Sequence, residues 1–296
     1  MSPIAQKSAS TPDGTRPKFG NLPALPEVTF RILELAKDPS STPAELQKLI
    51  CSDVALSTRI LKVVNSAFYG LSRQIGTIDR AVVVIGRNAV RNIAVAASMV
   101  KMFSAGPRVD SGRFRARDLW MHSTATATAA RIVAEEVRDS QANELFLAGL
   151  THDIGIMAEM HWSREKLSWC VNQMDFDGEG NPLQDLRDIE DSVFGVNHET
   201  LGMEVCQFWN FPEMISAVVG HHHNPCELFG VEQQQACIVQ LADLITASLE
   251  DGFRLDLPSI EIGESILDQL SLSLSQLEVI RERLRVQMDE VAQMLS

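Results

Sequence analysis

The chain is organised around one stretch near its middle, Leu147-Ala148-Gly149-Leu150-Thr151-His152-Asp153-Ile154-Gly155. This run is apolar and compatible with a helix, yet it places a histidine beside an aspartate. Burying a carboxylate costs several kcal/mol unless the group is paired or bound to a metal. Asp153 is therefore expected either at an exposed edge or beside a strong partner, and a buried metal site would explain the pair.

The remaining histidines support this interpretation. The chain has only seven, the others being His122, His161, His198, His221, His222 and His223. A single histidine such as His122 on a helix face of small residues is more often a satisfied core residue than a ligand. Three consecutive histidines at the end of an apolar helix are poor core fillers, although an exposed helix end that favours positive charge is the alternative. Asp243 interrupts another apolar helix and, like Asp153, needs a partner if it is buried.

The apolar residues recur at helical spacing, and no strand alternation persists, so we predict an all-α fold. Helix ends are also marked. In Thr42-Pro43-Ala44-Glu45, Thr42 can cap the free N–H groups, Pro43 suits the first helical position and Glu45 completes a capping box.

The chain divides by composition into four parts. We expect a disordered leader over residues 1–20, which are polar and have no apolar segment of the kind a secretory signal needs. An N-terminal helical lobe over 21–106 and a histidine-bearing helical lobe over 107–252 follow, and they meet at a Gly/Pro-containing loop. Residues 253–296 form a C-terminal helical appendage.

The appendage is predicted to contain one long helix. Ser275-Gln276-Leu277-Glu278 indicates a capping box at its start. Apolar residues then follow at near-heptad spacing: Leu277, Ile280, Leu284, Val291 and Leu295. We expect this helix to pack back on the body, and a homodimer seam is the alternative.

Composition and charge exclude several classes of protein. The net charge of −13 argues against general nucleic-acid binding. Residues 1–118 carry 17 Lys and Arg against 9 Asp and Glu, whereas 119–296 carry 9 against 30. This split fits two lobes that attract one another or a basic lobe that meets an acidic partner, and two ordinary solvated surfaces explain it as well. No apolar run is long enough for a membrane helix, and five dispersed cysteines favour a reduced, cytoplasmic protein.

Several ordered blocks of the chain resemble the HDOD domain, the HD-related output domain of bacterial signal-transduction proteins. They are Leu22-Pro23-Ala24-Leu25-Pro26, the run from Asp53 through Asn65-Ser66-Ala67-Phe68-Tyr69-Gly70, and Ile75-Gly76-Thr77-Ile78-Asp79-Arg80-Ala81 with Ile85-Gly86. The resemblance covers roughly residues 20–250. It implies a two-lobed helical fold whose C-terminal lobe is HD-like, and a regulatory role of the kind found in two-component signalling.

The histidine-bearing lobe is similar to the HD-superfamily metal phosphohydrolases in the order of its ligands. That resemblance assigns His122, His152, Asp153 and Asp243 to one metal ion. It assigns His198 and the pair His222-His223 to a second ion, with Asp153 as the bridge. One or two divalent ions are implied, with Fe, Mn, Zn, Ni or Mg as candidates. His161 and His221 lie outside the pattern.

The sequence also departs from the catalytic relatives. The HD-GYP phosphodiesterases usually continue His-Asp-x-Gly with Lys, where this chain has Ile156, and no Gly-Tyr-Pro follows the histidines. The first hypothesis is therefore a non-catalytic signalling module that binds a regulatory protein or a nucleotide ligand at the interface between its lobes. The alternative is a metal-dependent phosphohydrolase or cyclic-nucleotide phosphodiesterase, with Asp153 and His152 as its catalytic residues. A third hypothesis is an interaction protein with a metal-free histidine cluster.

Overall fold

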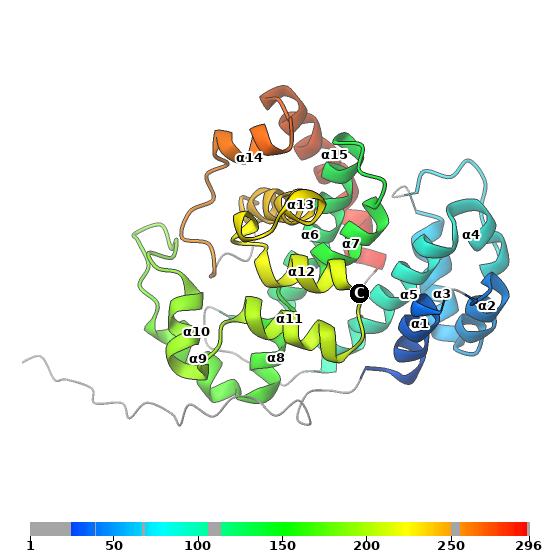
Figure 1. Ribbon diagram of the computed structural model, residues 1–296, viewed down its shortest axis with the longest axis horizontal. Coiled ribbons are helices and arrows are strands. Elements are labelled where there is room, and N and C mark those ends of the chain that lie inside the picture. The colour runs from blue at the N-terminus through cyan, green and yellow to red at the C-terminus, as the bar shows by residue number, and fades with distance from the viewer. Residues whose placement is uncertain (1–24, 39, 67–68, 106–113, 250–254, 295–296) are drawn as a thin grey trace, which may run out of the picture.

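The computed structural model describes residues 25–38, 40–66, 69–105, 114–249 and 255–294. These residues form fifteen α-helices and a short 3-10 helix, and their only extended pairing is an isolated bridge between Phe176 and Pro182. The all-α prediction is therefore confirmed. Figure 1 shows the first five helices gathered at one side of the molecule and the histidine-bearing helices at the other.

The first group of helices begins where the capping signals place it. Thr42 accepts a hydrogen bond from the backbone N–H of Glu45, whose side chain bonds back to the Thr42 backbone, so the predicted capping box is present. Asp53 caps the next helix by accepting from the backbone N–H of Leu56 at 2.9 Å. The five helices are α1 (Glu27–Lys37), α2 (Pro43–Cys51), α3 (Val54–Val64), α4 (Ile78–Ile85) and α5 (Arg87–Ala105).

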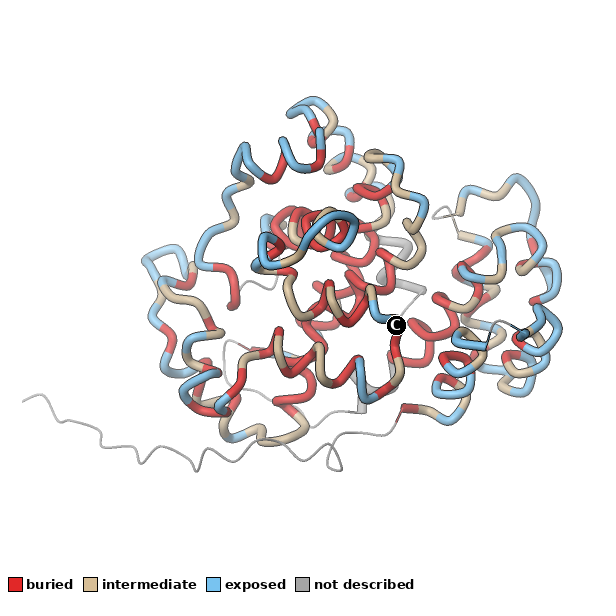
Figure 2. The backbone as a smooth tube through the Cα atoms, viewed as in Figure 1, coloured by how far each residue is buried: buried red, intermediate tan, exposed pale blue. Residues whose placement is uncertain are grey.

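The second group is built around one central helix. Helix α6 (Ala116–Glu136) packs against α7 (Ala142–Thr151) and α13 (Gly230–Ala247). Its small side chains permit this close packing, because a Cβ on Gly149 of α7 would already lie 2.9 Å from the carbonyl oxygen of Thr126. Figure 2 shows that buried residues dominate this centre. Around it lie α8 (Ile154–Trp162), α9 (Arg164–Gln173), α10 (Leu186–Phe194), α11 (His198–Phe208), α12 (Glu213–His221) and the 3-10 helix η2 (Pro225–Glu227).

The C-terminal helices return to this body. The short α14 (Glu264–Gln269) leads to α15 (Leu274–Met294), which packs along α6. Leu277, Ile280 and Leu284 are buried there, so the expected packing of this helix on the body is confirmed. The capping box, however, is formed by Ser273 with Gln276, two residues before the predicted start at Ser275. Both positions carry serine, and only the folded backbone shows which serine precedes the first helical turn.

Helices α5 and α7 connect the two groups of helices. Arg91 of α5 and Glu144 of α7 form an ion pair at 3.5 Å, and both side chains are largely shielded from solvent. The predicted leader and the predicted part boundaries at 106/107 and 252/253 lie outside the described residues. Within the described part of the chain, every helix is too short or too polar to cross a membrane.

Candidate metal centre

His152 and Asp153 lie at a junction between helices. Helix α7 ends at Thr151 and α8 begins at Ile154, so the apolar run that suggests one helix is divided at the polar pair. Gly155 then lets α8 approach the start of α11 very closely. A Cβ at Gly155 would lie only 2.0 Å from the carbonyl oxygen of His198. This contact between backbones brings Asp153 and His198 to the same place.

A first group of donors surrounds one oxygen of Asp153. His152 Nε2 lies 3.0 Å from Asp153 Oδ2, and His122 Nε2 lies 3.8 Å from it. His122 Nε2 is also 3.0 Å from Asp243 Oδ1, and the Nε2 atoms of His122 and His152 are 3.3 Å apart. These side chains come from α6, the α7–α8 junction and α13, and all four are buried.

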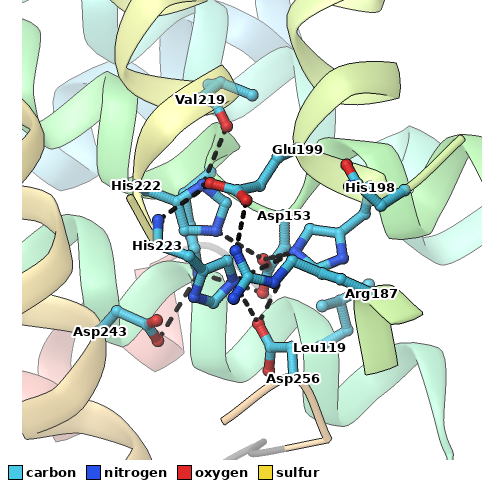
Figure 3. Close-up of polar contacts among 12 residues, drawn as sticks. Leu119, Asp153, Arg187, His198, Glu199, Val219, His222, His223, Asp243 and Asp256 are labelled. Atoms are coloured by element: carbon cyan, nitrogen blue, oxygen red, sulfur yellow. Dashed lines mark hydrogen bonds and ion pairs between the residues drawn. The ribbon is translucent and has the colours of Figure 1, made fainter. Parts of the chain in front are cut away.

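A second group faces the other oxygen of Asp153. His222 Nε2 lies 3.6 Å from Asp153 Oδ1, and His198 Nε2 lies 3.9 Å from it. His223 Nε2 is 3.2 Å from His198 Nε2 and 3.2 Å from Oδ2 of Asp256. Figure 3 shows the rings of His198, His222 and His223 converging with Asp153 and Asp256. Asp153 therefore joins the two groups through its separate oxygens.

Hydrogen bonds behind the rings orient three of the histidines. His152 Nδ1 lies 2.8 Å from the carbonyl oxygen of Gly149, and His222 Nδ1 lies 2.9 Å from that of Val219. His198 Nδ1 lies 2.8 Å from Oε2 of the buried Glu190. Each of these oxygens can accept a hydrogen bond from an N–H at Nδ1, and a neutral ring in that tautomer directs its Nε2 lone pair into the cluster. This is the orientation that metal-binding histidines require.

A charged network supports the second group. Glu199 accepts a hydrogen bond from the backbone N–H of His223 at 3.0 Å and holds Arg187 at 2.6 Å. Arg187 also donates to both carboxylate oxygens of Asp185. Arg187 is shared between two carboxylates, so its positive charge is balanced within this network. By holding Glu199 in place, Arg187 also helps to fix the backbone beside His223.

The donor atoms fit a divalent metal ion. Among the described residues, both oxygens of Asp153, both of Asp256, Oδ1 of Asp243 and Nε2 of His222 are buried without a hydrogen-bond partner. Leaving so many acceptors unsatisfied in the interior is costly, whereas a cation would satisfy them together. Imidazole nitrogens combined with carboxylate oxygens suit Zn, Fe, Mn and Ni. The cluster can therefore hold a metal ion.

Protonation of the cluster reflects its enclosed charges. Burial lowers the pKa of His152, but the carboxylates of Asp153, Asp243 and Asp256 together outweigh it and raise this pKa to about 9. Burial, with the charges of Asp153 and Asp243, raises the pKa of Asp256 to about 7. Protons and metal ions therefore compete for the same donors, since ligands must be deprotonated to bind.

The structure brings together all seven predicted ligands, namely His122, His152, Asp153, His198, His222, His223 and Asp243. Their role as metal ligands stays a prediction. His221 faces away from the cluster, because its Nδ1 bonds to the carbonyl oxygen of Ala217 and its Nε2 lies 3.9 Å from Glu227. Among the candidate metal ligands, Asp256 is the one that sequence reasoning missed. Its signal was a single carboxylate between Leu255 and Leu257, the same kind of anomaly that identified Asp153.

Solved structures show where this architecture recurs. An HDOD domain protein of unknown function from Geobacter sulfurreducens has a TM-score of 0.74 and 23% identity, with 93% of this chain and 92% of that chain covered. A proposed phosphohydrolase from Shewanella amazonensis SB2B has a TM-score of 0.70 and 21% identity, covering 94% and 96%. A proposed signal transduction protein from Marinobacter aquaeolei VT8 has a TM-score of 0.71 and 20% identity, covering 98% of this chain and 63% of that one.

Sequence comparison gives the family. An uncharacterized protein of Treponema pallidum (strain Nichols) is 26% identical over 208 residues, which are 70% of this chain but only 38% of that longer protein. Residues 22–225 match the family model of the HDOD domain, which covers the N-terminal helices and all the histidines of the cluster and ends before Asp243 and Asp256. The chain therefore belongs to the HDOD family.

Proposed function

We propose that this chain is a regulatory module of signal transduction that binds divalent metal in its histidine-bearing lobe. The observation that carries the proposal is the position of Asp153, whose two oxygens face two separate groups of donors. A carboxylate placed in this way is suited to bridge two metal ions. Metal binding would explain why so many polar side chains are buried in an apolar interior.

His122, His152 and Asp243 would hold one ion, and His198, His222 and His223 a second. A divalent ion bound there would supply a positive charge able to bind phosphate groups and to activate water. The side chains of the protein do the positioning. Glu190 holds the ring of His198, and the Gly149 and Val219 carbonyls hold those of His152 and His222.

The site favours regulation over catalysis because it is enclosed. The histidine and aspartate side chains of the two groups are at most 5% exposed. Ile156, at the position where the HD-GYP enzymes usually carry lysine, is fully buried in the core. A hydrolytic metal site needs a position open to substrate, whereas the described donor side chains present little of their surface to solvent.

Helix α7 supports a route from the site to the first group of helices. Its C-terminal end leads directly into His152, and Glu144 near its other end pairs with Arg91 of α5. A change at the metal centre that moved α7 would therefore act on this ion pair. We propose that a regulatory protein binds at the interface between the lobes and responds to that change. The alternative is that a nucleotide ligand binds there.

A metal-dependent phosphohydrolase is the second candidate. The donor set is consistent with this candidate too, because ions held by these residues could activate water and bind phosphate groups. The structural similarity to a proposed phosphohydrolase is consistent with this candidate. In that case Asp153 and His152 would be the catalytic residues.

Metal analysis of the full chain, purified without a histidine tag, tests the proposal. We expect bound transition metal that is lost in Asp153→Asn and retained in Asp188→Asn, an exposed carboxylate on α10. A wild-type protein that takes up no divalent metal after reconstitution would contradict metal binding. Hydrolysis of a phosphoester that depends on Asp153 would instead favour the enzyme.

A further inference from the structure

The segment that carries Asp256 is unusual because it is buried without being helical. Leu255, Asp256 and Leu257 lie between α13 and α14, and their residues are only 7%, 1% and 6% exposed. Both leucines belong to the main hydrophobic core, so they anchor the backbone on each side of the carboxylate. We call residues 255–257 the Asp256 strap.

The strap places a carboxylate directly against the second group of histidines. Asp256 Oδ2 lies 3.2 Å from His223 Nε2 and 3.9 Å from His198 Nε2. In Figure 3 Asp256 enters from a loop, whereas His198 comes from the start of α11 and His222 and His223 directly follow the end of α12. Neither carboxylate oxygen has a hydrogen-bond partner among the residues that the structure describes. A buried carboxylate in this position is expected to bind a cation.

Asp256 thereby completes a closed set of donors. His198, His222, His223 and Asp256 can place their donor atoms around one ion, with Asp153 adjoining them. Structural metal sites are closed in this manner, whereas catalytic ones leave a position for water or substrate. A carboxylate oxygen and a phosphate oxygen are both hard, anionic ligands, so they compete for the same position on a metal ion.

We propose that the Asp256 strap is an internal plug, in which Asp256 occupies the position on the second metal ion that a phosphate-type anion would otherwise take. This inference rests on the metal binding proposed above. The strap can leave the second ion without the unfolding of a helix, because release requires only that the side chains of Leu255 and Leu257 leave the core. Removal of the strap exposes the second ion to external anions.

The first test uses Co²⁺ as the metal and inorganic phosphate as the anion, on the full chain. Wild-type protein is expected to bind Co²⁺ and to keep the same visible absorption spectrum when phosphate is added. Asp256→Asn is expected to bind Co²⁺ roughly 10–100-fold more weakly at the second position, and its spectrum should respond to phosphate. Asp268→Asn, which changes an exposed carboxylate on the neighbouring α14, should behave like wild type.

The outcomes separate the two proposals. If wild type binds no Co²⁺, the metal-binding function fails and the plug fails with it. If wild type binds Co²⁺ and Asp256→Asn has the same affinity and no phosphate response, the plug alone is overturned. A wild-type spectrum that shifts with phosphate also overturns the plug, because the ion would then be open already.

A second measurement needs no variant and covers the case in which Asp256→Asn does not fold. Co²⁺ should slow amide hydrogen exchange in a peptide that contains residues 255–257 more than in one that contains α14. Ligation of Asp256 tethers the strap, whereas α14 supplies no donor to the cluster. Exchange in the strap that is unaffected by Co²⁺ in metal-loaded wild type would overturn the proposal.

Discussion

The substitution Gly155→Ala tests whether the approach of α8 to α11 builds the metal centre. The added Cβ would lie 2.0 Å from the carbonyl oxygen of His198 and 2.7 Å from its Cα, whereas real Cβ contacts stay beyond 3.0 Å. The two helices must therefore separate by about 1 Å, because the obstacle is backbone and cannot rotate away. Overpacking in a core typically costs about 1–3 kcal/mol, and we expect a loss of unfolding free energy near the upper end of this range.

The same displacement acts on the site. Asp153 and His198 stand on the two sides of this contact, with Asp153 Oδ1 already 3.9 Å from His198 Nε2. Metal–ligand distances tolerate errors of only about 0.2 Å, so the second ion should bind much more weakly in the variant. Urea unfolding followed by tryptophan fluorescence measures the first effect, and metal titration by calorimetry measures the second.

Gly178→Ala provides the matched control for this substitution. It makes the same change in the exposed turn between α9 and α10, at a glycine where a Cβ would meet nothing within 4 Å. Its unfolding free energy should stay within about 0.5 kcal/mol of wild type, with unchanged metal binding. A Gly155→Ala protein that matched this control in both measurements would refute the view that the contact positions the site.

Three further predictions address other parts of the molecule. Tyr69 is the only tyrosine, and burial, partly offset by Arg131 above its ring, raises its pKa to about 12. The neutral Tyr69 side chain should therefore contribute fully to stability below pH ~10, and this contribution should be lost as the pH rises towards 12. Ultraviolet titration measures the pKa of Tyr69, and unfolding at each pH measures the stability. Ionisation at the pKa of free tyrosine would contradict the prediction. Leu284 of α15 is fully buried, so Leu284→Ala should cost roughly 2–5 kcal/mol, whereas Arg283→Ala should cost less than ~1 kcal/mol because its ion pair with Glu135 is partly exposed. Equal losses of unfolding free energy in urea would argue against this packing. His122→Ala should lose the ion of the first group and keep that of the second in metal analysis, and loss of both or of neither would show that the two groups are not separate positions.

Sequence periodicity and capping chemistry determine much of this protein. The apolar spacing predicts helices because the helical repeat is a local property, and Thr42, Asp53 and Gly86 mark helix ends through interactions within a few residues. Asp153 and Asp243 could be singled out from the sequence, because carboxylates within apolar runs require a partner, and the resemblance to a known family implied the full set of seven ligands. The resemblance to a known family then supplied their grouping.

Only the tertiary structure decided how these residues meet. It divides the helix at His152 and Asp153, places the two donor groups on the two oxygens of Asp153, and adds Asp256 from a segment that the sequence assigns to the appendage. These features depend on contacts between residues far apart in the chain, such as the backbone of Gly155 against that of His198. Local patterns carry no information on such distances, because the geometry is set by how whole helices pack.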